Sequence, residues 1–177
     1  MIAGSARGTK LICPEGLAVR PTHDRVKEAL FSMLTGRICG ASVLDLFTGT
    51  GALSIEALSR GAENAVLVDS SDRSLSTARA NLEKTHLLDK ARLIKSDYLL
   101  FLQNADGQFD LILLDPPYQG EYLKNALALI AERKLLAPDG VIYCETEGEP
   151  PKEVTHLFEV LRDKKYGRAR VLLLKEL

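Results

Sequence analysis

At 177 residues, with 46% hydrophobic and 27% charged residues, the chain has the size and composition of one globular domain. Apolar runs such as residues 111–114 and 171–174 are too short to span a bilayer, and no export signal is expected at the start. The three cysteines form no CxxC pair and the three histidines are scattered. This pattern disfavours a disulfide framework and a metal site, and it indicates a reduced, cytoplasmic protein.

The net charge of −1 conceals a segregation of charge along the chain. Residues 1–40 carry six Lys and Arg against three acidic residues, and residues 151–177 carry seven against four. Residues 41–150 carry ten against seventeen. Basic residues at the two ends of the chain favour binding of a polyanion there, and the acidic central residues favour a ligand without phosphate. Chance clustering on solvated surfaces stays an open alternative.

The first forty residues are expected to form a separate appendage. Residues 2–14 have the pattern of a short extended segment, and a helix is expected to be capped near Thr22 and to end at Gly36. The core face of this helix, at helical spacing, is Val26, Leu30, Met33 and Leu34. We therefore expect an N-terminal hairpin and helix over 1–40 that packs on a main domain over 41–177.

From residue 42, short apolar segments typical of buried strands alternate with amphipathic segments typical of helices. The expected strands are 42–47, 64–71, 91–97, 109–115 and 141–146, and the expected helices are 52–61, 72–86, 99–102 and 121–135. A turn is expected at 138–140, and the last segments predict a hairpin that turns near Tyr166 and Gly167. The alternation predicts an α/β fold with a parallel sheet covered by helices on both faces.

Four successive predicted strands end in an aspartate, namely Asp45, Asp69, Asp97 and Asp115. One such residue alone would be an ordinary helix cap or turn former. Parallel α/β sheets bind ligands at the carboxyl ends of their strands. Four aspartates on that edge therefore predict a binding site.

The sequence DLFTGTGALS, residues 45–54, joins the first expected strand to the next helix and contains Gly49 and Gly51. Glycines let a ligand approach the backbone closely, although an ordinary tight turn is the alternative. Ser54 stands where the dinucleotide fingerprint has its third glycine. The carboxylate of Asp45 disfavours a pyrophosphate and favours a cationic ligand.

Two further aspartates describe the rest of that ligand. Asp69 is placed to accept hydrogen bonds from a ribose diol, and Asp97 to accept one from an adenine amine. A ligand with a ribose, an adenine, a positive charge and no phosphate is S-adenosylmethionine rather than NAD.

The stretch LLDPPYQG, residues 113–120, has the composition of a site that methylates an amine. An exocyclic amine of a nucleobase is a poor nucleophile and needs rigid hydrogen-bond acceptors. Asp115 and the carbonyl of Pro116 supply such acceptors, held by the fixed φ of consecutive prolines. Tyr118 offers a face on which an unpaired or flipped base can stack. The alternative is a strand end followed by a proline-rich turn.

The glycine loop and LLDPPY together resemble the class I S-adenosylmethionine-dependent methyltransferases that act on amino groups. The stretches IAGSARGTKL and LAVRPTHDRVKEALFSML narrow the likeness to the RsmD-type guanine-N2 methyltransferases of bacterial small-subunit (16S) ribosomal RNA. The resemblance covers most of the chain and weakens after about residue 145. It implies a Rossmann-like, seven-stranded, mostly parallel sheet, and an enzyme that acts on rRNA, free or within a ribonucleoprotein or 30S subunit. Nothing in the sequence demands more than a monomer, so a monomer is expected.

The resemblance also implies the residues of each site. The catalytic residues are Asp115, Pro116 and Tyr118, and the residues for S-adenosylmethionine are Asp45, Phe47, Gly49, Gly51, Asp69, Ser70, Asp97 and Tyr98. RNA is expected to bind at Arg7, Lys10, Arg20, Thr22 and Arg25. A second, weaker group of candidates for phosphate contacts is Lys164, Lys165, Arg168 and Arg170, which could instead keep an edge strand soluble.

Three other functions remain open at this stage. An N6-adenine methyltransferase of DNA or RNA would use the same chemistry. A non-catalytic module that binds RNA or S-adenosylmethionine would not need the acceptors of the DPPY stretch. A nicotinamide oxidoreductase is disfavoured by Ser54 and Asp45.

Overall fold

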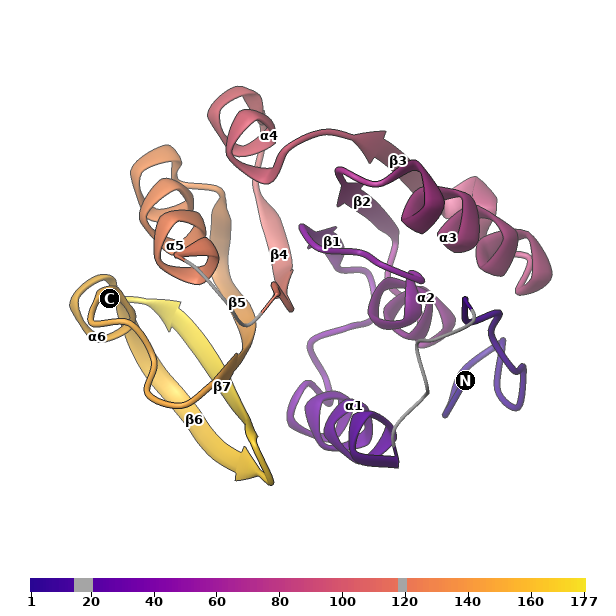
Figure 1. Cartoon of the computed structure of the whole chain (residues 1–177), viewed down its shortest axis with the longest axis horizontal. Helices are drawn as coiled ribbons and strands as arrows, with labels where there is room; N and C mark the ends of the chain where they lie inside the picture. Colours follow the sequence, from indigo (N-terminus) through magenta and orange to yellow (C-terminus); the bar gives the residue numbers. More distant parts are fainter. Residues whose placement is uncertain (15–20, 118–120) are drawn as a thin grey trace.

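The computed structural model describes residues 1–14, 21–117 and 121–177. The described strands form one seven-stranded sheet in the order β3-β2-β1-β4-β5-β7-β6 (Figure 1). The first five strands are parallel, and β7 runs antiparallel to both of its neighbours. The predicted α/β fold with a seven-stranded, mostly parallel sheet is confirmed.

The elements follow the predicted alternation, usually with ends one or two residues shorter. The strands are β1 Ser42–Asp45, β2 Asn64–Asp69, β3 Ala91–Lys95, β4 Phe109–Leu114, β5 Leu136–Glu147, β6 Phe158–Tyr166 and β7 Ala169–Glu176. The helices are α1 Pro21–Met33, α2 Ala52–Ser59, α3 Asp72–Lys84, α4 Tyr98–Asn104, α5 Tyr122–Arg133 and α6 Glu153–Leu157, with a 3-10 turn, η1, at Leu88–Lys90. Among the described helices, none is both long and apolar enough to cross a membrane.

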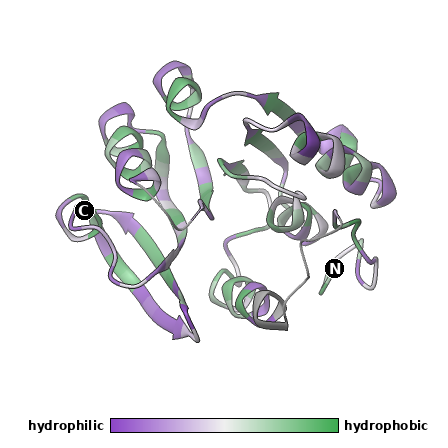
Figure 2. Ribbon diagram, viewed as in Figure 1, coloured by the Kyte–Doolittle hydropathy of each residue, from purple (hydrophilic) through white to green (hydrophobic). Residues whose placement is uncertain are grey.

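The sheet separates two hydrophobic cores. Side chains of α1, α2 and α3 pack on one face, and those of α4, α5 and α6 pack on the other. The central strands are apolar on both faces, as buried parallel strands must be, and in Figure 2 hydrophobic residues line the sheet while polar residues lie on the outer sides of the helices. Each face of the sheet is therefore covered, so the carboxyl ends of the parallel strands are the place where a ligand can bind.

Two local predictions were wrong, and one element was missed. The hairpin expected at the N-terminus is not found in residues 1–14, which contain turns and no strand. The turn expected at 138–140 is an irregularity within β5. The strand begins earlier than predicted, at the buried Leu136, which pairs with Phe109, and the register then shifts before Val141 pairs with Leu111. Asp139 accommodates this irregularity with a φ of 63°. The short helix α6 was not predicted, since its five residues carry too little periodicity to be recognised.

Glu56 of α2 holds the start of the chain. Its carboxylate is fully buried and accepts hydrogen bonds from the backbone N–H groups of Ile2 and Ala3, at 2.9 and 3.0 Å. Arg60 donates to the same carboxylate at 2.8 Å and lies over the ring of Phe31 in α1. One buried charge thus joins the N-terminal segment to two helices of the main sheet.

Asn81 of α3 makes a second connection. Its side chain donates to the carbonyl of Ile12 and to the carbonyl of Thr50, both at 3.0 Å, and accepts from the N–H of Ile12 at 2.6 Å. Thr50 belongs to the glycine loop between β1 and α2. A single amide therefore links the N-terminal segment to that loop.

The substitution Glu56→Gln tests the first connection. The amide nitrogen of glutamine would face a backbone N–H donor, so we expect a loss of about 2 kcal/mol in the free energy of unfolding. This corresponds to a fall in Tm of about 4–8 °C. Thermal unfolding measures the change, with Glu63→Gln, an exposed position between α2 and β2, as the control. Equal Tm values for the two variants would contradict this role.

Candidate functional site

Acidic residues of four adjacent strands meet at one edge of the sheet. In the order β2-β1-β4-β5 these are Asp69, Asp45, Asp115 and Glu145. Asp45 pairs with residues of both neighbouring strands, and Asp115 and Glu145 directly follow the paired residues Leu114 and Cys144. The predicted cluster at the strand ends is therefore present for three of the aspartates, and Glu145 is a member that the sequence analysis missed.

The glycine loop leaves an open approach to its backbone. Gly49 has a φ of 53°, and a Cβ placed on it would find nothing within 4 Å. Its N–H donates to Asp69 at 3.0 Å, which fixes the loop against the end of β2. Gly51 has another role, because a Cβ there would lie 3.3 Å from both Ala78 and Ile55. Gly51 thus permits α2 and α3 to pack closely, while Gly49 faces free space.

Ser54 forms a hydrogen bond with Asp45 that its position in the sequence did not reveal. Its hydroxyl donates to the buried carboxylate of Asp45 at 2.7 Å. Burial raises the pKa of Asp45 to about 6, and the hydrogen bond from Ser54 acts in the opposite direction. The residue that replaces the third glycine of the dinucleotide fingerprint therefore stabilises the negative charge of its neighbour.

A second hydroxyl in the loop is buried without such a bond. Thr48 lies close enough to Asp45 to favour its charged form, yet its hydroxyl oxygen makes no hydrogen bond of good geometry within the described residues. A buried hydroxyl without a partner is unfavourable in the protein alone. Together with the open face of Gly49 and the charge of Asp45, it fits a site that is completed by a polar, cationic ligand.

The predicted ribose and adenine aspartates differ in their surroundings. Asp69 is oriented by two backbone N–H groups, from Gly49 at 3.0 Å and from Ser71 at 2.8 Å. Ser70, between them, is exposed. Asp97 caps α4, accepting from the N–H groups of Leu99 and Leu100 at 2.8 and 3.2 Å. The capping role was one of the two readings of this residue, and its contact with adenine stays a prediction.

Three aromatic rings gather beside the loop. Phe47 lies 5.2 Å from Tyr98 and 6.0 Å from Tyr122, and the two tyrosine rings are 5.5 Å apart. Burial raises the pKa of Tyr98, whose hydroxyl is bonded to Asn125. Tyr122 was not among the predicted residues, although it lies four positions after Tyr118 and is exposed. The rings form an apolar wall next to the strand ends of β1 and β3.

The centre of the acidic edge is the pair Asp115 and Glu145. Burial, then the charge of Glu145 and that of Asp45, raise the pKa of Asp115 to about 8. Glu145 is buried, and it accepts a hydrogen bond from the hydroxyl of Tyr143 at 2.9 Å. Pro116 is buried behind Asp115, whereas Tyr118 lies outside the described residues. The arrangement is a rigid array of hydrogen-bond acceptors with an excess of negative charge.

The residues predicted to contact RNA lie apart from this edge. Arg7 and Lys10 are exposed on the N-terminal segment, which packs on α2 and α3, and Arg25 is exposed on α1. Arg20 and the side chain of Thr22 lie outside the described part of the structure. The contacts of these residues with RNA stay predictions.

Comparison with known proteins places this architecture in a family. The model of the family described as "Conserved hypothetical protein 95" matches residues 1–175. A protein of Bacillus subtilis named "Putative rRNA methyltransferase YlbH" is 38% identical over 99% of this chain and 98% of its own length. The Ribosomal RNA small subunit methyltransferase D of Haemophilus influenzae is 35% identical over 94% of this chain and 88% of its own length.

The fold agrees with that assignment. The solved structure of an Escherichia coli protein named "Putative methyltransferase yhhF" superposes with a TM-score of 0.90 at 35% identity, covering 99% of this chain and 96% of the other. The resemblance to the RsmD-type proteins, stated from the sequence, is thereby confirmed, and the chain belongs to the family described as Conserved hypothetical protein 95.

Proposed function

We propose that this protein transfers a methyl group from S-adenosylmethionine to the exocyclic N2 amine of a guanine in bacterial small-subunit ribosomal RNA. The observation that carries the proposal is the pair of carboxylates, Asp115 and Glu145, side by side at the ends of β4 and β5 and next to an open glycine loop. Relatives of similar length that are named small-subunit rRNA methyltransferases support the class of substrate.

The residues around the glycine loop hold the cofactor. Asp69, oriented by the loop itself, accepts from the ribose diol, and the open face of Gly49 admits the ligand to the backbone. Asp45 provides the negative potential that attracts the positively charged sulfonium. When bound, that sulfonium supplies the electrophilic methyl group. Phe47 and Tyr98 form the apolar side of the same pocket.

Asp115 and the carbonyl of Pro116 orient the target nitrogen. Hydrogen bonds from the amine to these acceptors turn its lone pair toward the methyl group and increase electron density on nitrogen. The methyl–sulfur bond would break as the N–C bond forms, leaving S-adenosylhomocysteine as the neutral thioether product. The methylated nitrogen would then release one proton to the ionised carboxylate of Asp115. Tyr118 is proposed to stack on the base, a contact of about 1–3 kcal/mol.

Two adjacent carboxylates favour guanine over adenine. Guanine presents two adjacent donors, N1–H and the N2 amino group, whereas N1 of adenine, next to its amine, is an acceptor. Asp115 and Glu145 offer only acceptors when ionised. Adenine would place a lone pair against a carboxylate. This difference favours guanine-N2 methylation over the alternative, N6-adenine methylation.

The first test is transfer of tritium from labelled S-adenosylmethionine to small-subunit rRNA, free and protein-bound, followed by nucleoside analysis. We expect label in N2-methylguanosine. Label in N6-methyladenosine would replace the proposed base with the alternative one. Binding of the cofactor without label on any form of the RNA would indicate a binding module. Comparing the two forms of RNA also tests whether the substrate is free rRNA or rRNA bound to protein. Gel filtration tests whether the protein is the proposed monomer.

Asp69→Ala and Asp115→Ala are expected to separate cofactor binding from chemistry. Loss of the ribose contact in Asp69→Ala should weaken S-adenosylmethionine binding about 10- to 100-fold. Asp115→Ala should lower kcat at least about 100-fold while the Kd of the cofactor changes little. Calorimetry and single-turnover methylation measure the two quantities, and each variant is the control for the other. Equal loss of binding in both variants would mean that Asp115 belongs to the cofactor site.

The pH dependence of methylation should report the charge of Asp115. Its pKa of about 8 means that the carboxyl group of the free enzyme is protonated below that pH and gains its full acceptor capacity above it. We therefore expect kcat/KM to rise with pH and to level off above about 8.

Glu145→Gln provides the matched change. It removes one of the two charges that raise the pKa of Asp115, so the rise in kcat/KM should move to lower pH. The hydrogen bond from Tyr143 can still be accepted by the glutamine amide oxygen. An inflection that stays in place in Glu145→Gln would show that another group controls the profile.

A further inference from the structure

A groove lies between the C-terminal half of α1 and strand β6, away from the glycine loop. On the helix side, Ala29, Ser32, Met33 and the following Arg37 line it. On the side of the hairpin, Leu161, Arg162, Lys164, Tyr166 and Leu173 line it. Three of these residues are basic and none is acidic. The groove thus brings together the two ends of the chain that carry the excess of positive charge.

A β-bulge directs the basic residues of β6 into this groove. Val160 pairs with Leu174 and Arg162 pairs with Leu173, so Leu161 is one extra residue in β6. Side chains alternate between the two faces of a strand, and one extra residue reverses that alternation. Val160 accordingly packs in the core beneath α5 and α6, whereas Arg162, two residues later, faces the side of α1.

The residues of β6 beyond the bulge keep this new parity. Lys164 pairs with Val171 and Tyr166 pairs with Ala169. Val171 belongs to the core beneath α1, which confirms the direction in which its partner Lys164 points. The result is a row of two cations and one aromatic ring on a single face of β6.

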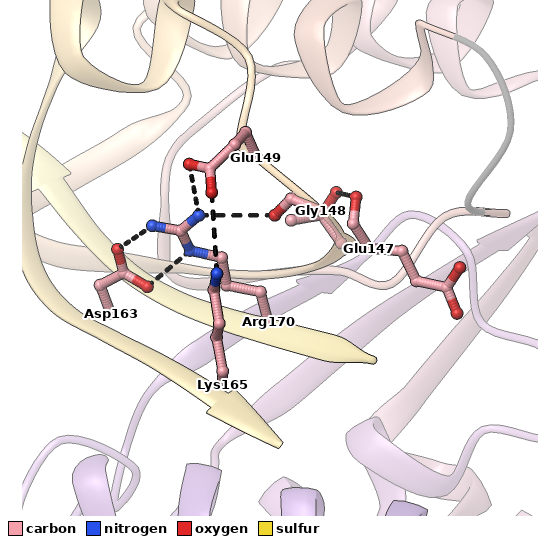
Figure 3. A network of polar contacts seen from close by, with 7 residues as sticks. Glu147, Gly148, Glu149, Asp163, Lys165 and Arg170 are labelled. Carbon is pink, nitrogen blue, oxygen red and sulfur yellow. Dashed lines mark hydrogen bonds and ion pairs between the residues drawn. The ribbon is translucent and has the colours of Figure 1, made fainter. Parts of the chain in front are cut away.

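Two other basic residues of the hairpin, Lys165 and Arg170, are paired on the opposite face of the sheet, and Figure 3 shows their contacts. Arg170 forms a bidentate pair with Asp163, at 2.8 and 2.6 Å, and contacts Glu149 at 2.6 Å. Lys165 lies 3.7 Å from Glu149. These ion pairs lower the pKa of Asp163 and of Glu149. Of the four basic residues predicted as a second RNA-contacting group, Lys165 and Arg170 thus have acidic partners, which Lys164 lacks among the ion pairs of the described residues.

We infer that this groove binds the sugar–phosphate backbone of the substrate RNA beside the modified nucleotide, through Arg37, Arg162 and Lys164. The inference rests on the proposed function and names a part of the RNA site that lies outside the N-terminal residues. Arg37 is held toward the groove by a 2.9 Å hydrogen bond from its Nη1 to the carbonyl of Asp139. Tyr166 adds a flat face for a base.

The register of the sheet places the groove at a useful distance from the site of methylation. Lys164 pairs with Val171, which pairs with Glu145, the neighbour of Asp115. Lys164 is therefore level with the acidic edge and three strand spacings from Asp115, about 14 Å. At the rise of a nucleic-acid strand this corresponds to about four nucleotides. A strand that delivers its base to Asp115 can thus place nearby phosphates in the groove.

The test compares two variants that lose the same charge. Arg162→Gln with Lys164→Gln removes the two cations of β6 from the groove, and Lys152→Gln with Lys165→Gln removes two exposed cations elsewhere on the C-terminal segment. Binding of fluorescent small-subunit rRNA fragments is measured from low to moderate salt. We expect the groove variant to bind about tenfold more weakly and its salt slope to fall by about 1.5, because two phosphate contacts are lost. The control variant should change little.

Two further measurements show whether both variants are intact. Tm and the Kd for S-adenosylmethionine should be unchanged in both variants, because all four positions are exposed. Equal RNA affinity and equal salt slope in the two variants would overturn the inference. Normal binding of free RNA by the groove variant, with loss of methylation only on a protein-bound particle, would also overturn it and assign the groove to an acidic protein.

The same experiment separates this inference from the proposed function. A groove variant with weakened RNA binding, together with a wild-type protein that transfers no label to rRNA, would retain the groove and reject the methyltransferase proposal. Methylation by the wild type without any effect of the groove variant on RNA affinity would do the reverse.

Discussion

Electrostatic repulsion among buried carboxylates is the constraint that organises this protein. Asp45 on β1 and Glu145 on β5 are buried, and Asp115, directly after β4, lies between their strands and is partly buried. Burial raises the pKa of Asp45 and of Asp115. Such an arrangement is costly in the protein alone, because each charge loses hydration and gains a like-charged neighbour. A cation offsets both costs. The same repulsion among the carboxylates therefore favours the proposed binding of a sulfonium and of a base that donates hydrogen bonds.

The rest of the fold holds these carboxylates in place. Parallel strands that are apolar on both faces fix which side chains emerge at the carboxyl edge, and the hydroxyl of Ser54 supplies the hydrogen bond that Asp45 needs. The N-terminal segment is attached by internal polar groups as well, through Glu56 and Asn81. Because Asn81 also bonds to Thr50, the segment that carries Arg7 and Lys10 and the loop that faces the cofactor share one side chain.

Much of this architecture could be predicted from the sequence, since it follows from local patterns. The alternation of apolar strands and amphipathic helices predicted the sheet, and the aspartates at strand ends predicted the edge where the site lies. The substitution of Ser54 for a glycine was visible, but its bond to Asp45 depends on how α2 packs against β1.

Glu145 was missed for a similar reason. One acidic residue in an apolar strand has no local signature, and its importance arises from its neighbour Asp115, thirty positions earlier in the chain. The packing role of Gly51 was missed because a glycine near a ligand and a glycine at a helix contact are alike in sequence. The proximity of Ala78 reveals that role, and the contact of Gly51 with the cofactor stays a prediction.

The bulge at Leu161 means that the pairing of β6, and not its composition alone, decides which charges face the groove. If the same residues ran on from Val160 as a regular strand, Leu161 would pair with Leu173, and every later side chain would exchange its face. Asp163 and Lys165 would then stand opposite α1 in place of Arg162 and Lys164, so that one acidic and one basic side chain would replace two cations. Two hairpins with the same basic residues can therefore present different charges to this groove, and the pairing of β6 with β7 carries information about substrate binding that a count of basic residues does not.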